Sequence, residues 1–154
     1  MYRIREMEWN GVDSASIYNM QFHDERLRKD IVSFEEGEGI SLDITDLHDL
    51  SQFDLLIRPL SGYYINKTYR FHVTVPEFFP FQPYKVKLVD PIFHPNIDEE
   101  GRVCLNLIRE DWVPSIDLSQ VACSLQFLLS EPNPDDPLNE EAATLLKEDP
   151  ETFR

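Results

Sequence analysis

Residues 93–112 read FHPNIDEEGRVCLNLIREDW, and this stretch decides how the rest of the chain is interpreted. Cys104 lies eight residues after Asn96, among proline, asparagine, glycine and acidic residues. A cysteine with a purely structural role more commonly lies inside an unbroken apolar run. The turn-rich setting therefore makes Cys104 a candidate for chemistry.

Length and composition favour one folded domain. The chain has 154 residues, of which 42% are apolar, enough for a single core. Two cysteines, Cys104 and Cys123, do not make a disulfide framework, so we expect a reducing cytoplasmic or nuclear compartment. The start of the chain, MYRIREMEWN, has no apolar core of a secretory signal, and no apolar run is long enough for a membrane span.

The formal net charge of −15 bears on the class of partner. So acidic a surface repels phosphate backbones, which argues against nucleic-acid binding and favours basic partners. A high charge that merely keeps a small protein soluble is the competing explanation.

The hydrophobic pattern predicts an α+β fold with its helices segregated from the sheet. Apolar residues at three- and four-residue steps from Ile17 to Phe34 predict an amphipathic helix that begins near Ser14. Residues 1–13 are interpreted as a short N-terminal extension and residues 14–154 as one core domain. Strand patterns and later helical patterns complete the order, with strands at 40–45, 53–60, 68–75 and 85–89, and helices at 118–129 and 139–147.

Short links between the four strands indicate an antiparallel meander. A last helix is expected to begin at Pro150 and to be cut short at Arg154. Residues 91–116 lack a regular pattern, and long ordered loops of this kind are usually functional.

Four roles are open for Cys104: a small buried hydrophobe, a metal ligand, a protease nucleophile or an acyl carrier. A zinc site needs about four closely spaced ligands, but Cys123 is nineteen residues away and the histidines are scattered, so no metal is predicted. A protease nucleophile needs a histidine base. His94 is confined between Phe93 and Pro95 and is better placed to order the loop, and the surrounding acidic residues disfavour a strongly activated thiolate.

An acyl carrier has milder requirements. Exchange between thioesters is nearly thermoneutral, so a modestly nucleophilic cysteine suffices if a donor supports the developing oxyanion. Asn96 is a candidate for that donor, and equally for a turn residue that holds the loop; the two roles are compatible. Cys123, next to Ala122 in a helical pattern, is interpreted as structural.

Three segments together resemble ubiquitin-conjugating enzymes over residues 14–154. They are HPNI with Cys104 and then Trp112 at eight-residue steps, the acidic loop EPNPDDPLN, and the proline-rich turn FFPFQP. The resemblance implies the fold of that family, with an N-terminal helix, a four-stranded antiparallel meander, an active-site loop and C-terminal helices. One departure is Tyr84, which stands after Pro83 where the family usually has a second proline.

Within the family, VCLNLIREDW and EPNPDDPLNEEAA are most similar to conjugating enzymes of the neddylation pathway. Asn106 and Val113 stand where the commoner ubiquitin carriers tend to have aspartate and serine. The implied modifier is a Nedd-type ubiquitin-like protein, and the implied substrates are cullins.

The resemblance also implies residue roles. Cys104 would carry the modifier as a thioester, Asn96 would support the oxyanion or the loop, and Asp136 would act near the incoming lysine. His94 and Pro95 would structure the loop. The implied docking residues are Phe81, Pro114 and Ser115 for a RING-type ligase, and Arg26, Arg28 and Lys29 for the activating enzyme. The alternatives are that Asp136 is an ordinary turn residue, that Phe81 belongs to the core, and that the basic residues of the helix form a solvated face.

The implied enzyme acts as a monomer without metal or cofactor, because the modifier is activated upstream. Its partners are a ubiquitin-like modifier, an activating enzyme, a RING-type ligase and a cullin. An ordinary ubiquitin carrier and a non-catalytic interaction module of the same fold are the alternatives.

Overall fold

The computed structural model describes residues 14–153, with side chains from His23 onward. The extension expected at residues 1–13 lies outside the described residues. The elements follow in the order α1 (Ser14–Val32), β1 (Ile40–Asp43), β2 (Gln52–Ile57), β3 (Tyr69–Thr74), β4 (Lys85–Leu88), the 3-10 helix η1 (Asn106–Ile108), α2 (Leu118–Ser130), α3 (Glu140–Glu148) and α4 (Pro150–Phe153).

The four strands form one antiparallel sheet in which neighbours along the chain are neighbours in space. Side chains alternate across the sheet, so Phe71 and Val73 of β3 are buried while His72 between them is partly exposed. The register pairs Phe71 with Leu55 and Val73 with Phe53, which joins the apolar residues of β2 and β3 into one inner face.

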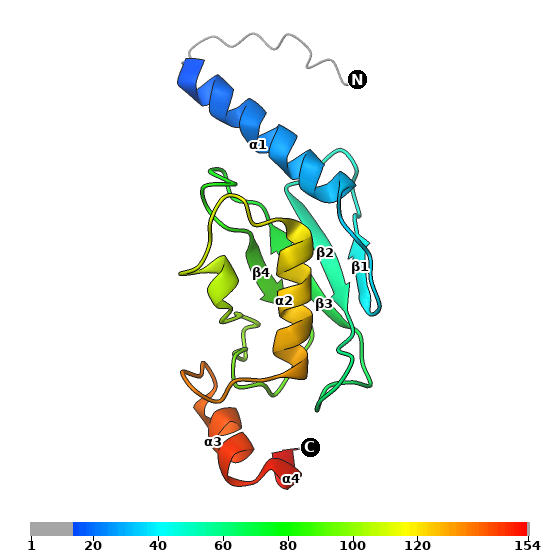
Figure 1. Cartoon of the computed structure of the whole chain (residues 1–154), viewed down its shortest axis with the longest axis vertical. Helices are drawn as coiled ribbons and strands as arrows, with labels where there is room; N and C mark the ends of the chain where they lie inside the picture. The colour runs from blue at the N-terminus through cyan, green and yellow to red at the C-terminus, as the bar shows by residue number, and fades with distance from the viewer. Residues whose placement is uncertain (1–13, 154) are drawn as a thin grey trace.

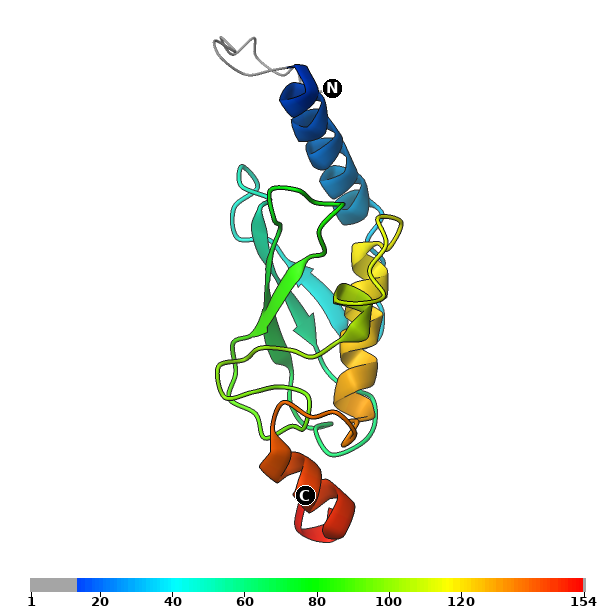
Figure 2. The same ribbon diagram turned by 90° about the vertical axis from the view of Figure 1, so that its left-hand side faces the viewer.

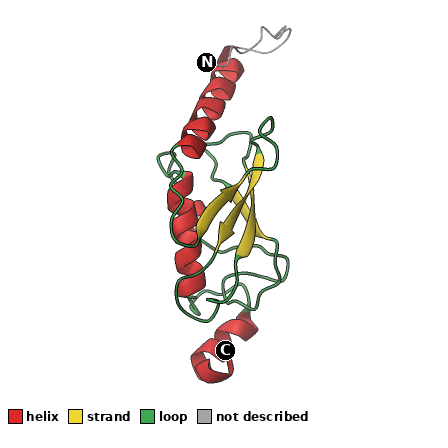
Figure 3. Ribbon diagram, turned by 90° about the vertical axis from the view of Figure 1, so that its right-hand side faces the viewer, coloured by secondary structure: helices red, strands yellow, loops and turns green. Residues whose placement is uncertain are grey.

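α2 lies along the inner face of the sheet and closes the core (Figures 2 and 3). Its start is fixed by a capping box, in which the Asp117 side chain accepts from the Gln120 amide and the Gln120 side chain accepts from the Asp117 amide. Leu118, Val121 and Leu125 are fully buried against the sheet. Each such side chain contributes about 1.5–3 kcal/mol by leaving water.

α1 lies at one end of the molecule, and α3 and α4 lie at the opposite end (Figure 1). The carboxylate of Asp30 anchors α1, because it accepts from Arg26 Nε at 2.8 Å and from the Tyr84 hydroxyl at 2.6 Å. Burial raises the pKa of Tyr84, which keeps the hydroxyl protonated as a donor. Tyr84, the departure from the family's proline-rich turn, thus has a structural role of its own.

The predicted α+β order is confirmed, with four strands in an antiparallel meander and the expected helices. The strands end one to three residues earlier than their apolar patterns, as in β2, which stops at Ile57 instead of reaching Leu60. The stretch expected to be irregular contains η1. Within residues 14–153, no helix combines the length and the apolar character that crossing a membrane requires.

Candidate active site

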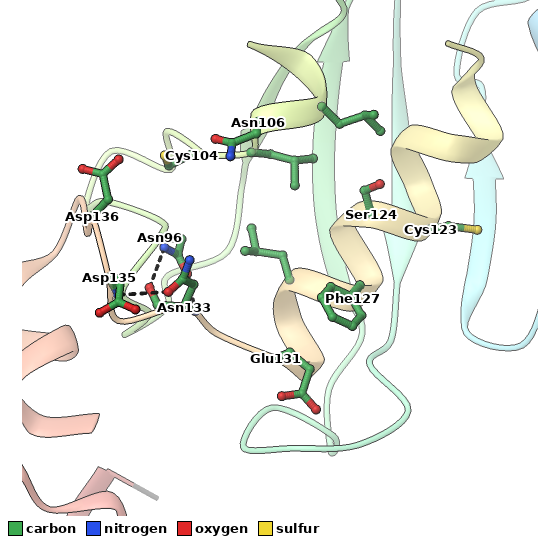
Figure 4. Close-up of a pocket in the computed structure, with 13 residues that line it drawn as sticks. Asn96, Cys104, Asn106, Cys123, Ser124, Phe127, Glu131, Asn133, Asp135 and Asp136 are labelled. Carbon is green, nitrogen blue, oxygen red and sulfur yellow. Dashed lines mark hydrogen bonds between the residues drawn. The ribbon is translucent and has the colours of Figure 1, made fainter. Parts of the chain in front are cut away.

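Cys104 lies in an open groove of about 500 Å³ between the active-site loop, η1, α2 and the acidic loop that follows α2 (Figure 4). The groove combines apolar side chains of η1 and α2 with amide side chains of both loops and η1 and with carboxylates on the side of the acidic loop. Its lining consists of Asn96, Cys104, Leu105, Asn106, Leu107, Cys123, Ser124, Phe127, Leu128, Glu131, Asn133, Asp135 and Asp136.

Cys104 is a free, half-buried cysteine at the edge of this groove. Its backbone amide donates to the carbonyl of Asn96 at 2.8 Å, just after an isolated antiparallel bridge between Ile97 and Val103. The chain therefore folds back on itself between residues 96 and 104, and this return brings Asn96 and Cys104 together from eight residues apart.

His94 is fully buried beneath the loop. Its Nε2 lies 3.0 Å from the Leu128 carbonyl, and its Nδ1 accepts from the Asn96 amide at 2.9 Å, which fixes a neutral ring with the proton on Nε2. Burial lowers the pKa of His94 to about 4, and the bond to Leu128 only partly opposes this. Tyr64 stacks on the imidazole with 5.1 Å between ring centroids. His94 is thus a neutral internal support with no lone pair aimed at Cys104.

Asn96 and Pro95 connect the active-site loop to the acidic loop. The Asn96 side chain donates from Nδ2 to the Asn133 carbonyl at 2.8 Å and accepts at Oδ1 from the Asn133 amide at 2.9 Å (Figure 4). The Pro95 carbonyl accepts from the amides of Leu138 and Asn139, at 2.9 and 3.0 Å. In this state the Asn96 amide is occupied by the loop, with its side chain almost completely buried.

The acidic loop places carboxylates along one side of the groove. Asp136 is exposed and has a φ of 56°, a left-handed conformation that is uncommon for residues other than glycine. Asp135 also lines the groove and forms an ion pair with Lys147 of α3 at 3.1 Å. The structure therefore brings together Cys104, Asn96 and Asp136, the three residues for which the sequence suggested chemistry, around one groove.

A contact that the sequence did not suggest involves Arg109. Its Nη1 donates to the sulfur of Cys104 at 2.9 Å. η1 turns the chain between the two residues, and this turn has no clear signature in the sequence. The acidic neighbours Glu110 and Asp111 further obscured Arg109 as a cation belonging to the site.

Phe81, Pro114 and Ser115 are exposed and lie outside the groove lining. The loops that carry them are joined by Trp112, whose indole Nε1 donates to the Pro80 carbonyl at 2.9 Å. Phe81 is 63% exposed, so it is a surface residue and not part of the core.

The structure separates Arg26 from Arg28 and Lys29, which the sequence grouped on one helix face. Arg28 and Lys29 are exposed on α1. The Arg26 guanidinium instead points inward, where it bonds to Asp30 and to the carbonyls of Pro114 and Ile116. Its contacts are those of an internal link between α1 and the loop before α2.

The structural role expected for Cys123 is wrong. Cys123 is an exposed free cysteine on α2 and lines the rim of the groove. As for metals, no group of three or more His, Cys, Asp or Glu side chains suited to hold an ion occurs among the described residues.

Comparison with known proteins places this geometry in context. The sequence model of the family described as ubiquitin-conjugating enzyme matches residues 26–154. The chain is 39% identical over 149 residues to the NEDD8-conjugating enzyme ubc12 of Schizosaccharomyces pombe, and this match covers 97% of this chain and 80% of that protein. It is 42% identical to the NEDD8-conjugating enzyme UBC12 of Saccharomyces cerevisiae, covering 83% and 71%.

A third relative is longer. The NEDD8-conjugating enzyme Ubc12 of Dictyostelium discoideum is 41% identical over 83% of this chain, which spans 56% of that relative's length. Among solved structures, S. cerevisiae Ubc12 superposes with a TM-score of 0.81 at 39% identity, covering 90% of this chain and 78% of that one. The E2 domain of a Toxoplasma gondii ubiquitin conjugating enzyme gives a TM-score of 0.75 at 29% identity, covering 84% and 90%.

Proposed function

The chain belongs to the ubiquitin-conjugating enzyme family, a family of transferases that act on ubiquitin-like proteins, and from that premise we propose that it is a carrier for a NEDD8-type modifier. It accepts the modifier from an activating enzyme as a thioester on Cys104 and passes it to a substrate lysine. The similarity to three NEDD8-conjugating enzymes at about 40% identity supports this choice of modifier.

The observation that carries the proposal is the position of Cys104. Its free sulfur lies at the edge of an open groove, with Asn96 and Asp136 on the same lining. A protease would need a histidine base at the sulfur, whereas the nearby His94 is buried and neutral and bonds to backbone groups. A thioester carrier needs no such base, because its substrate is already activated.

In the proposed transfer step, the lysine amine attacks the thioester carbonyl and the Cys104 sulfur leaves. Asp136 is exposed on the groove and suits an incoming ammonium group, as a charge partner and a proton acceptor. Asn96 keeps the two loops in register through Asn133 and would support the oxyanion only after exchanging one of those bonds.

The proposed partners are those that the family resemblance implies, and the residues assigned to them are exposed. Phe81, Pro114 and Ser115 are proposed to meet a RING-type ligase, with a cullin as the substrate. Arg28 and Lys29 are proposed to meet the activating enzyme. The internal bonds of Arg26 favour a supporting role for it behind these surfaces. We propose a cytoplasmic or nuclear location.

Parallel loading with two activating enzymes tests the proposal. The protein is incubated with ATP and either the NEDD8 or the ubiquitin activating enzyme with its modifier. We expect an adduct with NEDD8 that thiol reductant cleaves, and an adduct on Cys104→Ser that resists reductant because it is an oxygen ester. The Cys123→Ser protein is the matched control and should load as the parent does.

Other outcomes point to the alternatives. Efficient loading with ubiquitin in place of NEDD8 would make the chain an ordinary ubiquitin carrier. No loading with either modifier would contradict the carrier role and leave a non-catalytic interaction module. If the protein does load, its discharge by free lysine separates a complete transferase from a carrier that only accepts the modifier.

A further inference from the structure

Arg109 reaches Cys104 because η1 reverses the chain immediately after the cysteine. Leu105 precedes η1 in an extended conformation, and Arg109 follows it, with the Arg109 amide donating to the Asn106 carbonyl at 3.0 Å. Five residues of extended chain would separate the two positions by about 17 Å. Instead, Nη1 of Arg109 donates to the Cys104 sulfur at 2.9 Å.

The charges around the groove make this cation distinctive. Among the described residues that line the groove, Glu131, Asp135 and Asp136 are acidic and none is basic. Nearby carboxylates disfavour negative charge on a sulfur, and an adjacent cation favours it. The Arg109 guanidinium therefore offsets, at the reacting atom itself, the acidity of the groove.

The side-chain amide of Asn96, which the sequence suggested as a donor for the reaction, is already used in the loop. Nδ2 of Asn96 donates to the Asn133 carbonyl, and Oδ1 of Asn96 accepts from the Asn133 amide. The donor in contact with the Cys104 sulfur is consequently Arg109.

We propose that Arg109 is a catalytic residue that stabilises negative charge on the Cys104 sulfur in both steps of the proposed function, on which this inference rests. In loading, the Cys104 thiol gives its proton to solvent, its sulfur forms a bond to the modifier carbonyl, and the activating enzyme's cysteine leaves as a thiolate that is then protonated. In transfer, the lysine nitrogen forms the amide bond, the carbon–sulfur bond breaks, and its electron pair returns to Cys104. The amine proton passes to Asp136 or to solvent.

Alkylation of Cys104 by iodoacetamide tests the sulfur contact without any modifier. The proteins compared are Arg109→Gln, which removes the charge, Arg109→Lys, which keeps it, and Arg58→Gln, a matched loss of an exposed arginine that does not line the groove. Mass spectrometry of the digested protein follows Cys104, with the exposed Cys123 as internal reference. Arg109 is itself exposed, so circular dichroism is expected to show all variants folded.

We expect Cys104 of Arg109→Gln to react about five- to tenfold more slowly than in the parent, the effect of removing one close cation at a partly exposed site. Arg109→Lys should recover most of the rate, and Arg58→Gln should match the parent. Equal Cys104 rates in Arg109→Gln and Arg58→Gln would overturn the proposed contact.

Single-turnover discharge to free lysine tests the catalytic role. Arg109→Gln should lower the rate at saturating lysine by about tenfold, with the half-saturating lysine concentration unchanged, because the guanidinium acts on the leaving sulfur and not on the amine. A discharge rate of Arg109→Gln equal to that of the parent would overturn the catalytic role. If even the parent never loads, the proposed function fails, while the alkylation rates still decide whether Arg109 acts on the sulfur.

Discussion

Asn96 and Asn133 exchange two hydrogen bonds between the active-site loop and the acidic loop, one from Nδ2 of Asn96 to the Asn133 carbonyl at 2.8 Å and one from the Asn133 amide to Oδ1 of Asn96 at 2.9 Å. This pairing ties the segment before Cys104 to the acidic loop from a distance of 37 residues along the chain. It explains how a loop rich in proline and aspartate keeps Asp136 on the same groove as Cys104.

Replacing Asn96 by alanine should lower the free energy of unfolding by about 1–3 kcal/mol, because both backbone groups of Asn133 lose their partner. Asn96→Asp keeps the acceptor but turns a second oxygen toward the Asn133 carbonyl, so at neutral pH we expect a similar loss. Urea unfolding measures both, with the exposed Asn66→Ala as control. Equal stability of Asn96→Ala and Asn66→Ala would show that the pair does not hold the loops.

The stability of the protein should depend on pH through His94. Burial lowers the pKa of His94 to about 4 in the folded chain, against about 6.5 for an unfolded histidine. Well above pH 6.5 the ring is neutral in both the folded and the unfolded chain, so the titration of His94 takes nothing from the free energy of unfolding there. As the pH falls from 6.5 to about 4, the unfolded chain takes up a proton that the folded chain does not, so about 3 kcal/mol is lost progressively.

His94→Gln isolates this effect, because its amide still offers a donor to the Leu128 carbonyl but does not titrate. The difference in unfolding free energy between parent and His94→Gln should be largest above pH 6.5 and should shrink toward pH 4. Urea titrations at half-unit pH steps give that difference, in which the carboxylates common to both proteins cancel. A difference that stays constant over this range would contradict a neutral buried His94.

The sequence was sufficient for the elements whose pattern is local. The alternation of β3 and the apolar spacing of α2 each predicted the right structure, because burial on one face is encoded within a few residues. Asn96 was paired with Cys104 from the residues themselves, but Asp136 was added only by the family resemblance, since no local pattern links position 96 to position 136.

The contacts that escaped prediction depend either on a turn without a sequence signature or on tertiary packing. The bond between Arg109 and Cys104 depends on η1, and the bond between Tyr84 and Asp30 joins residues 54 positions apart. Cys123 shows a different limit, because its helix was predicted correctly but not the side of it that faces the sheet. Successive helix residues are rotated by about 100°, so Cys123 is exposed although Ala122 is fully buried.

α4 should stabilise the active-site loop through Phe153. The Phe153 ring is buried against Tyr63, Phe93 and Tyr64, with centroids at 4.9, 5.6 and 6.3 Å, and Tyr64 in turn stacks on His94. Phe153→Ala should cost about 1–3 kcal/mol, less than a central core phenylalanine because α4 is short.

Hydrogen exchange distinguishes this route from a general loss of stability. In Phe153→Ala, the amides of residues 94–97 should exchange faster than in the parent by more than the amides of β2 and β3 do. Phe78→Ala, which removes a phenylalanine that is 57% exposed, is the control and should change neither. Uniform acceleration over the whole sheet would argue against a specific link from α4 to the loop.

Arg26 and Arg28 lie two residues apart on α1, but we expect their substitution to affect different properties, stability for Arg26 and loading for Arg28. Arg26 is partly buried, and its loss would leave the almost fully buried carboxylate of Asp30 with Tyr84 alone and the Ile116 carbonyl without its 2.7 Å donor. We expect Arg26→Ala to lower the free energy of unfolding by about 2–4 kcal/mol.

Arg28→Ala, at an exposed position, should change the free energy of unfolding by less than about 0.5 kcal/mol but slow loading by the activating enzyme, as should Lys29→Ala. Thermal unfolding and initial loading rates are measured on all three proteins. A stable Arg26→Ala protein that loads slowly would return Arg26 to the docking face, because the internal bonds would then contribute little.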